Sequence, residues 1–166
     1  MIKKTILLFA LLATSFLSAQ DEVKLNITDA LVLKTVTASY EHYFDQQTSL
    51  GVSGLFNFEN ESSDFRYNEN VVITPFVRHY FSTESLWNFF GELFLAYNTG
   101  DQDSVVNRFP VSDNYSDGAL GLAVGYKYIS PGGFTVDIHG GAGRNLFSKE
   151  SPRVVPRIGI NIGCQF

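Results

Sequence analysis

FFGELFLAY, residues 89–97, is the stretch that decides the fold, because a single carboxylate, Glu92, stands in an otherwise apolar or glycine run. The spacing of its apolar residues would allow a helix, in which several of them share one face. It would equally allow a strand, in which Glu92 faces one way while its neighbours Gly91 and Leu93 face the other. The sequence on either side of the stretch has to decide between the two.

Alternation with a period of two continues on both sides of this stretch and favours the strand. Fifteen Phe, eight Tyr and fourteen Gly residues, with turn signals at short intervals, are typical of an all-β chain. In each alternating segment one set of side chains is apolar, and the other is small, polar or charged. Eight such segments are predicted as strands: residues 22–28, 35–44, 49–58, 70–81, 88–98, 118–129, 134–144 and 153–166.

The connections between these segments indicate the kind of barrel. A soluble sandwich or barrel would show the same alternation with its apolar face inward, so alternation alone does not identify the solvent. Short connections (45–48, 82–87 and 130–133) alternate with mostly longer, acidic ones (59–69, 99–117 and 145–152), after a brief first one at 29–34. This pattern is typical of bacterial outer-membrane barrels. The predicted fold is therefore an eight-stranded antiparallel up-and-down transmembrane β-barrel with short periplasmic turns and longer extracellular loops.

The first nineteen residues are predicted to be a cleaved signal peptide. Lys3 and Lys4 precede an apolar run over residues 6–17, and Ala19 supplies a small residue for cleavage. Residues 20–166 would then form a single barrel domain with ten basic and seventeen acidic residues, a net charge of −7. The lone Cys164 excludes a disulfide framework, and no basic stripe indicates nucleic-acid binding.

Aromatic and proline residues add two expectations about the barrel wall. Pro75 and Pro156 each remove a ladder hydrogen bond, so both are expected to mark bulges or strand ends. Aromatic side chains gather near the short-turn end, as an interfacial girdle should. The girdle is predicted from Tyr40, Phe44, Phe81, Phe89, Tyr126, Tyr128, Phe134 and Phe166.

Several short motifs carry a resemblance to a known group of proteins. They are Ala19–Gln20 at the signal end, EVKLNI (22–27), SYEHYF (39–44), TSLGVS (48–53), TPFVRHYF (74–81) and the terminal Phe166. With these motifs the chain resembles the small eight-stranded outer-membrane barrels related to outer-membrane proteins A and X, and more narrowly uncharacterised exported barrels of Bacteroidetes. The resemblance implies a monomer in the outer membrane of a Gram-negative bacterium. Its partners would be outer-membrane lipid, lipopolysaccharide and, during insertion, the barrel assembly machinery.

The inward-facing set carries charges of both signs. Seven residues are predicted to form an ionic network inside the barrel: Lys24, Glu41, Arg78, Glu92, Lys127, Asp137 and Arg157. Counting outward from the turns places Arg78 opposite Glu92, and Lys127 and Lys24 nearly opposite Asp137 and Glu41. Arg157 is left without an evident partner. The predicted count is four positive charges against three negative ones.

An eight-stranded barrel is just wide enough for side chains to fill its interior. Unpaired buried charges cost several kcal/mol each, so the charges inside such a barrel are expected to pair with one another. The sequence therefore predicts a plugged interior rather than an aqueous channel. A proton or ion path, or a switchable plug, remains an alternative interpretation of the same residues.

No catalytic, cofactor or metal site is predicted. His42 and His79 fall in the outward set, and His139 is inward, two residues from Asp137. None of the three is followed by serine in the His-x-Ser spacing of lipid A deacylases, although a triad from distant positions remains open. A metal site needs three or four convergent ligands, which nothing nearby in sequence supplies.

The long acidic connections are the remaining surface. They are interpreted either as solvated loops or as a binding surface, with Tyr67, Phe109 and Tyr115 as candidate contact residues. Their paired Asp residues could also hold a divalent cation that bridges lipopolysaccharide phosphates. The predicted function is a non-enzymatic outer-membrane barrel with a plugged interior and an envelope-structural or surface role. The alternatives are a loop-mediated binding or adhesion protein, a soluble lipocalin-like carrier and a small pore.

Overall fold

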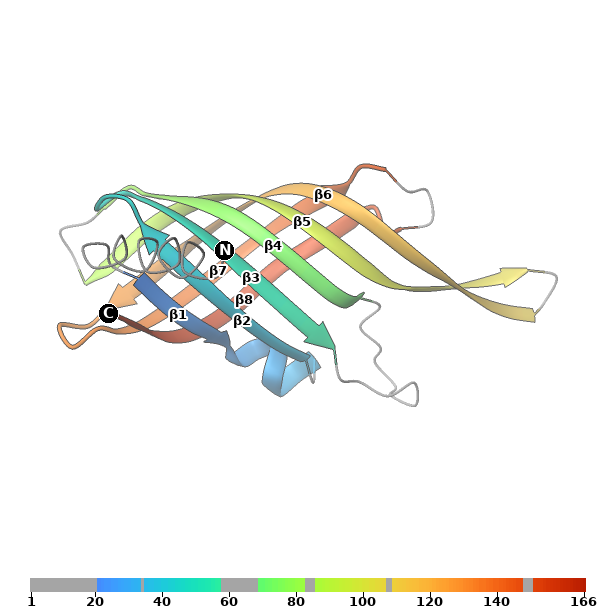
Figure 1. Cartoon of the computed structure of the whole chain (residues 1–166), viewed down its shortest axis with the longest axis horizontal. Coiled ribbons are helices and arrows are strands. Elements are labelled where there is room, and N and C mark those ends of the chain that lie inside the picture. Colours follow the sequence, from blue (N-terminus) through green and yellow to red (C-terminus); the bar gives the residue numbers. More distant parts are fainter. Residues whose placement is uncertain (1–20, 34, 58–68, 83–85, 107–108, 148–150) are drawn as a thin grey trace, which may run out of the picture.

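The computed structural model describes residues 21–33, 35–57, 69–82, 86–106, 109–147 and 151–166, except the side chains of 32–33, 69 and 101–114. Eight strands in chain order form a closed antiparallel barrel in which β1 pairs with both β2 and β8 (Figure 1). The strands are β1 (Asp21–Asn26), β2 (Thr35–Tyr43), β3 (Thr48–Asn57), β4 (Glu69–Tyr80), β5 (Trp87–Val106), β6 (Phe109–Ile129), β7 (Phe134–Asn145) and β8 (Val154–Gln165). A short π-helical turn, η2 (Asp29–Leu33), follows β1. Among the described residues, no helix is long and apolar enough to cross a membrane.

The predicted eight-stranded antiparallel barrel is confirmed, and most strand boundaries lie within two residues of the predicted ones. The exception is the predicted loop over residues 99–117. This stretch instead continues β5 and β6 as a paired hairpin, with Thr99 opposite Ser116 and Val106 opposite Phe109. Figure 1 shows the hairpin projecting beyond the other strands. The prediction of a loop was wrong because polar composition was interpreted as absence of a strand.

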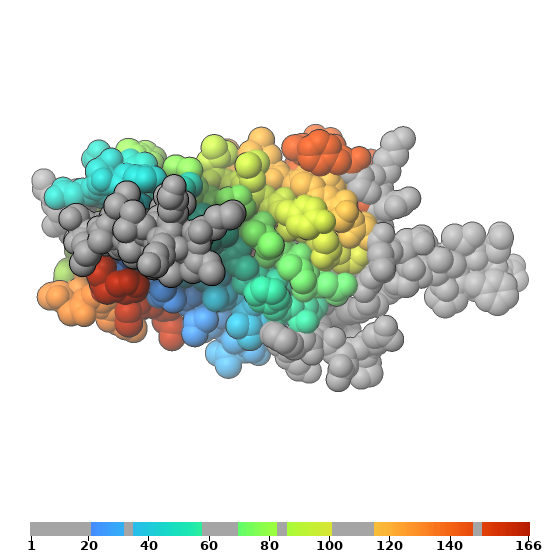
Figure 2. Space-filling model, viewed as in Figure 1, coloured from blue at the N-terminus to red at the C-terminus, as the bar shows by residue number. Residues whose placement is uncertain are grey.

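The two faces of the barrel wall have opposite character. Along β5, Glu92 is 2% exposed and Phe94 is 1% exposed, whereas Leu93 and Leu95 are 52% and 56% exposed. On the other strands the same alternation places apolar side chains outside, and charged, polar and aromatic ones with some aliphatic ones inside. Figure 2 shows side chains of neighbouring strands packed side by side on the outer surface where no grey atoms cover them. The lipocalin-like alternative is therefore wrong, since it requires the apolar set to face inward.

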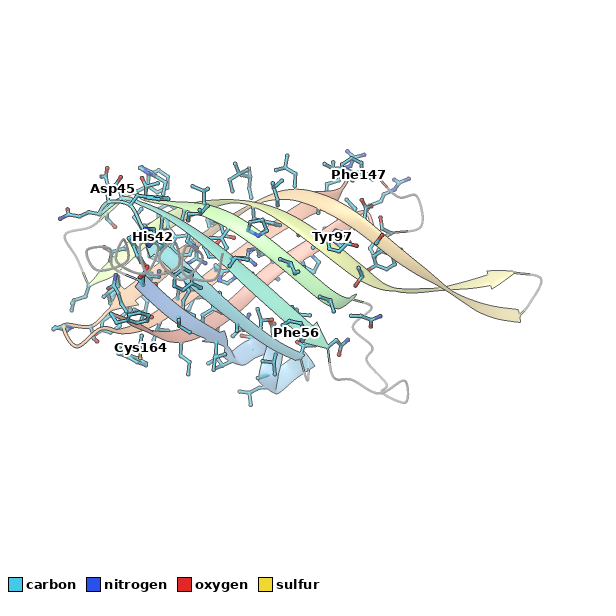
Figure 3. All side chains as sticks on the ribbon, in the orientation of Figure 1. His42, Asp45, Phe56, Tyr97, Phe147 and Cys164 are labelled. Atoms are coloured by element: carbon cyan, nitrogen blue, oxygen red, sulfur yellow. The ribbon has the colours of Figure 1, made fainter. Side chains whose placement is uncertain are left out.

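The two ends of the barrel also differ. The connections β2–β3, β4–β5 and β6–β7 lie at one end, the short-turn end, where Asp21 and Phe166 exchange backbone hydrogen bonds of 3.0 and 2.8 Å. The opposite end is the loop end. Figure 3 shows His42 and Asp45 toward the short-turn end and Phe147 toward the loop end. Both described chain ends thus lie on the short-turn side, as the strand pattern predicts.

Exposed aromatic rings contact one another around the short-turn end. Phe81 stacks on Phe89 with ring centroids 5.5 Å apart, and Phe89 contacts Tyr126 at 5.1 Å. Trp87, which the sequence analysis omitted, contacts Tyr128 at 5.4 Å. Amphipathic rings in this position suit a membrane–water boundary.

The two prolines behave differently from one another. Pro75 lies inside β4 opposite Val52, and the β4–β5 register is the same on either side of it, so the expectation of a bulge or strand end there was wrong. Pro156 pairs with Ala142 of β7. The β1–β8 pairing ends at Asn161, five residues after Pro156 in the chain and nearer the short-turn end. In the described chain, no strand therefore pairs with Pro156 on the β1 side. A free strand edge tolerates proline because no ladder donor is lost.

Candidate functional site

Eight charged side chains converge inside the barrel, and we call them the interior ionic cluster. They come from every strand except β3 and are balanced, with four cations and four carboxylates: Glu22, Lys24, Glu41, Arg78, Glu92, Lys127, Asp137 and Arg157. Seven of them are the residues singled out in the sequence. Glu22 was missed, although it shares the inward parity of Lys24 and is 0% exposed. Adding Glu22 corrects the predicted imbalance of four positive against three negative charges.

Arg78 of β4 lies at the centre of the cluster and is 1% exposed. Its Nε donates to Glu92 Oε2 at 2.7 Å, directly across the β4–β5 ladder. Its Nη1 donates to Asp137 Oδ2 at 2.9 Å and to Glu41 Oε2 at 3.3 Å. The cross-strand neighbour is thus the one predicted, and two further carboxylates reach the same guanidinium from the other side of the lumen.

The two lysines bridge the carboxylates of β1, β2 and β7. Lys24 Nζ donates to Glu41 and, at 3.0 Å, to Asp137 Oδ2. Lys127 Nζ lies 2.6 Å from Glu22 Oε2 and 2.9 Å from Glu41 Oε2. Lys127 faces Asp137 in the β6–β7 register, but its ammonium group pairs with the other two acids instead. The expected Lys127–Asp137 ion pair was wrong because these long side chains extend across the lumen.

Arg157 of β8 has a partner, which corrects the expectation that it lacks one. Its Nε donates to Glu92 Oε1, while Arg78 donates to Oε2 of the same carboxylate. Its Nη1 donates to Ser53 Oγ at 3.2 Å. At 13% side-chain exposure it is more open than the other cluster cations, which are 0–1% exposed.

Neutral donors satisfy the remaining carboxylate oxygens. Tyr80 donates to Glu41 Oε1 at 2.7 Å, and Tyr43 and Thr135 donate to the two oxygens of Glu22 at 2.9 and 2.6 Å. Buried carboxylates are tolerated only when their lone pairs are hydrogen-bonded in this way. The two tyrosines share the inward parity of the neighbouring charges, so alternation alone could have identified them.

Three phenylalanines pack against the cations, Phe76 and Phe94 from the loop side and Phe90 from the short-turn side. Arg78 lies 4.2 Å from the Phe90 ring centroid and 4.8 Å from that of Phe76, within the range of cation–π attraction. Each ring faces a glycine directly across the ladder: Phe76 faces Gly51, Phe90 faces Gly125 and Phe94 faces Gly121. A Cβ added at any of these glycines would lie within 2.6 Å of the facing ring. The glycines therefore provide the room that the rings occupy.

His139 lies beside the cluster and contacts Asp137. Its Nδ1 is 3.1 Å from Asp137 Oδ1 and 3.3 Å from Asn161 Nδ2. In the described part of the chain, no group of three or more His, Cys, Asp or Glu side chains is arranged to hold a metal ion. His42 contacts Asp21 at 2.7 Å near the outer rim, and His79 is exposed.

A cavity of about 350 Å³ lies on the loop side of the cluster, and we call it the upper cavity. Arg157, His139 and Asn161 give it a polar floor, and its walls are mainly apolar, including Leu55, Val72, Phe94, Ala96 and Val155. Asp29 of η2 also lines it and accepts a hydrogen bond from Thr37 at 2.5 Å. Burial raises the pKa of the Asp29 carboxyl above its ordinary value, although that hydrogen bond acts in the other direction. No feature of the sequence predicted this cavity.

Of the three candidate contact residues of the loops, the structure describes the side chain of Tyr115. Tyr115 lies in β6 and is only 5% exposed, so the expectation that it offers an external contact was wrong. Tyr67 and the side chain of Phe109 lie outside the described residues. No loop-binding site is therefore assembled from these three residues in the described structure.

A closed eight-stranded antiparallel barrel with an apolar outer face and a charged interior has the architecture of the small outer-membrane barrels. Solved structures of that class are similar to this chain over 89% of its length. The chain belongs to the family described as "Protein of unknown function (DUF3575)", whose model matches residues 5–151. No curated protein matches the chain in sequence.

Three solved structures show the likeness. The N-terminal β-barrel domain of Pseudomonas aeruginosa OprF has a TM-score of 0.63 at 12% identity, with 96% of that domain covered. Neisserial surface protein A has a TM-score of 0.55 at 12% identity and 96% coverage. Ail, the attachment invasion locus protein of Yersinia pestis, has a TM-score of 0.50 at 13% identity and 99% coverage. The resemblance predicted from the sequence is confirmed for the fold.

Proposed function

We propose that this protein is a non-enzymatic outer-membrane barrel whose interior is blocked by side chains, with an envelope-structural or surface role. One observation carries the proposal: an apolar outer face surrounds a balanced, buried ionic cluster. In water this arrangement would expose the apolar set and bury the charges, the reverse of a soluble protein. In a lipid bilayer both faces are in favourable surroundings.

The proposal gives the cluster a structural role. Eight charges held by one another and by tyrosine hydroxyl groups leave the lumen blocked at the level of Arg78. The partners in this proposal are outer-membrane lipid and lipopolysaccharide, with the barrel assembly machinery during insertion and a cleaved signal peptide for export. The protein acts as a monomer, because the barrel closes on itself and leaves no pairing edge at the level of the cluster.

Membrane fractionation with heat-dependent migration on a denaturing gel tests the location. The folded barrel should be recovered with outer membranes and should migrate differently before and after boiling. Recovery of the folded protein in the soluble periplasmic fraction would refute the proposal.

Planar-bilayer recording tests the blocked interior separately. Purified protein should give no stable large single-channel current, because the cluster leaves no continuous aqueous path. Large, stable currents that persist at high salt would support the small-pore alternative and contradict the plug.

A second candidate, surface contact through a binding or adhesion role, is favoured by the β5–β6 hairpin. Its strands stay paired from Tyr97 opposite Gly118 to Val106 opposite Phe109 and project beyond the barrel. A paired ladder carries its backbone outward from the wall, where a partner can contact it. An epitope tag inserted between residues 107 and 108 should be detected on intact cells, and detection only after lysis would place this end of the barrel in the periplasm.

A further inference from the structure

The wall of the barrel is incomplete beside the upper cavity. β1 ends at Asn26, where it pairs with Asn161, while β8 continues to Val154 and stays paired with β7 throughout. In the described chain, residues 154–160 of β8 therefore have no partner strand on their other side. η2 stands at that position, and Figure 1 shows it at the loop-side end of β1, next to β2. We call this interruption between η2 and β8 the seam.

The upper cavity reaches the seam. Its lining includes Thr28 and Asp29 on one side of the seam, and Pro156 and Ile158 on the other. Ile158 belongs to the outward set and is 66% exposed, so a cavity that it lines extends from the interior to the outer face. The Ile160 N–H donates to Thr28 Oγ1 at 3.1 Å and bridges the seam at its lower edge.

Among the described residues, side chains fill two other boundaries of the cavity. Below it, the ionic cluster closes the lumen at Arg78. Toward the loop end, Asn98 is 0% exposed and donates to Asn145 at 2.9 Å, and Asp117 is buried with Ser151 as its hydrogen-bond donor. The seam is thus the side on which the cavity meets outward-facing, apolar residues of the wall.

The chemistry of the lining identifies an occupant. Arg157 uses its Nε and Nη1 within the protein, and its Nη2 has no acceptor among the described residues. His139 donates through Nδ1 to the Asp137 carboxylate, so Nε2 of the neutral ring is an acceptor and offers no hydrogen to an anion. The Arg157 donor lies in the floor under apolar walls, and a volume of about 350 Å³ lies near the lower limit of small-molecule sites, ~300 Å³. One anion with one apolar chain fits this description.

We propose that the upper cavity binds a single fatty acid from the bilayer, with its carboxylate on Arg157 and its chain along the apolar walls. The seam is the entrance, since Ile158 and Ile160 place it within the apolar outer face. Asp29 lines the same cavity and accepts a hydrogen bond from Thr37. The inference rests on the proposed membrane location, because only a bilayer supplies the ligand through the wall.

Electron paramagnetic resonance tests the proposal with stearic acid that carries a nitroxide near its methyl end. The purified full-length barrel in phosphatidylcholine nanodiscs should immobilise about one label per barrel, tighter than the exchanging lipid around its wall. The methyl ester with the same label should bind at least ~10-fold more weakly, because it removes the charge that Arg157 recognises. Equal binding of acid and ester, or no slowly exchanging population, would refute the carboxylate site.

Variants separate the cavity from the outer wall. Val72→Trp and, independently, Ala96→Leu fill the cavity and should each abolish the immobilised population. Leu122→Trp is the matched control on the outer face, where the residue is 66% exposed, and it should bind like the wild type. Arg157→Gln should weaken binding ~10-fold and Arg157→Lys less so. Loss of binding in the Leu122 variant, or retained binding in both filled variants, would overturn the proposal.

The route and the location are tested independently. Octanoate, which stays mostly in water, tests the route. If the cavity binds octanoate but excludes stearate from the bilayer, it opens to water at the loop end. The seam is then not the entrance. Because the reconstituted barrel needs no cellular location, failure here leaves the fractionation result intact. A soluble fractionation result would refute the proposed function whatever the nanodisc result.

Discussion

Removing the central cation is the sharpest test of the interior ionic cluster. Arg78→Met keeps the length and apolar stem of the side chain and deletes the guanidinium that three carboxylates contact. Removing one partner of a buried ion pair costs ~3–5 kcal/mol. Each of the three acids keeps a second cation, since Glu92 retains Arg157 and both Glu41 and Asp137 retain Lys24. We therefore expect a loss at the lower end, ~3 kcal/mol of unfolding free energy.

A second substitution shows whether the loss comes from Glu92. In Arg78→Met/Glu92→Gln the carboxylate that lost one of its two cations is gone, so the double variant should be more stable than the sum of the single changes by ~1–2 kcal/mol. Full recovery is not expected, because Glu92→Gln also removes the acceptor of Arg157. Urea unfolding of the barrel in lipid vesicles, followed by far-ultraviolet circular dichroism and by the gel shift on heating, measures all four proteins.

Asn98→Ala provides the matched control. Asn98 is also buried on β5, six residues from Glu92, or ~20 Å along the strand, and its amide donates to Asn145. Combined with Arg78→Met it should be additive within ~0.5 kcal/mol. Additivity for Glu92 as well, or a stability of Arg78→Met equal to the wild type, would refute the contact and its energetic role.

Two further substitutions test the packing and the titration of the interior. Gly125→Val should destabilise the barrel by ~1–3 kcal/mol in the same urea assay, because its Cβ would lie 2.6 Å from Phe90 Cζ. The control Gly132→Ala should change stability little, because a Cβ there would have no atom within 4 Å. Equal effects of the two substitutions would contradict the close approach of Gly125 and Phe90. Asp29 has a folded-state pKa raised by burial, so its stabilising contribution is present at low pH and is lost as pH rises through that pKa. Asp29→Asn, which keeps an oxygen to accept from Thr37, should leave stability at pH 4 nearly unchanged and raise it at pH 8, and a larger gain at pH 4 would contradict the sign.

The sequence predicted the barrel well because alternation is a direct consequence of strand geometry. Once Glu92 is assigned inward, the period of two assigns every neighbour, and the same rule should have included Glu22 two residues before Lys24. The extended β5–β6 hairpin escaped prediction for the complementary reason. Beyond the bilayer a ladder needs no apolar face, so its backbone pairing leaves no hydrophobic pattern in residues 99–117.

Contacts inside the lumen were harder to predict than positions. Register places Lys127 opposite Asp137, but a lysine stem is long enough to pass its neighbour and reach Glu22 and Glu41. Which carboxylate the Lys127 ammonium group contacts depends on all the interior side chains together, and not on the β6–β7 hairpin alone. The upper cavity is less predictable still, because it depends on where β1 ends relative to β8.

The unequal strand lengths explain why charges and cavity occupy different levels. A buried charge needs partners around it, and a complete ring of strands supplies them. Where β1 has ended, the ring is open at the seam, and the interior there is mainly apolar, with Leu55, Val72 and Val155, which need no hydrogen-bond partner. Arg157, the cluster member on the seam strand, is accordingly its most exposed cation. The same early end of β1 that leaves Arg157 incompletely enclosed therefore gives the barrel an interior site without opening a channel through the plug.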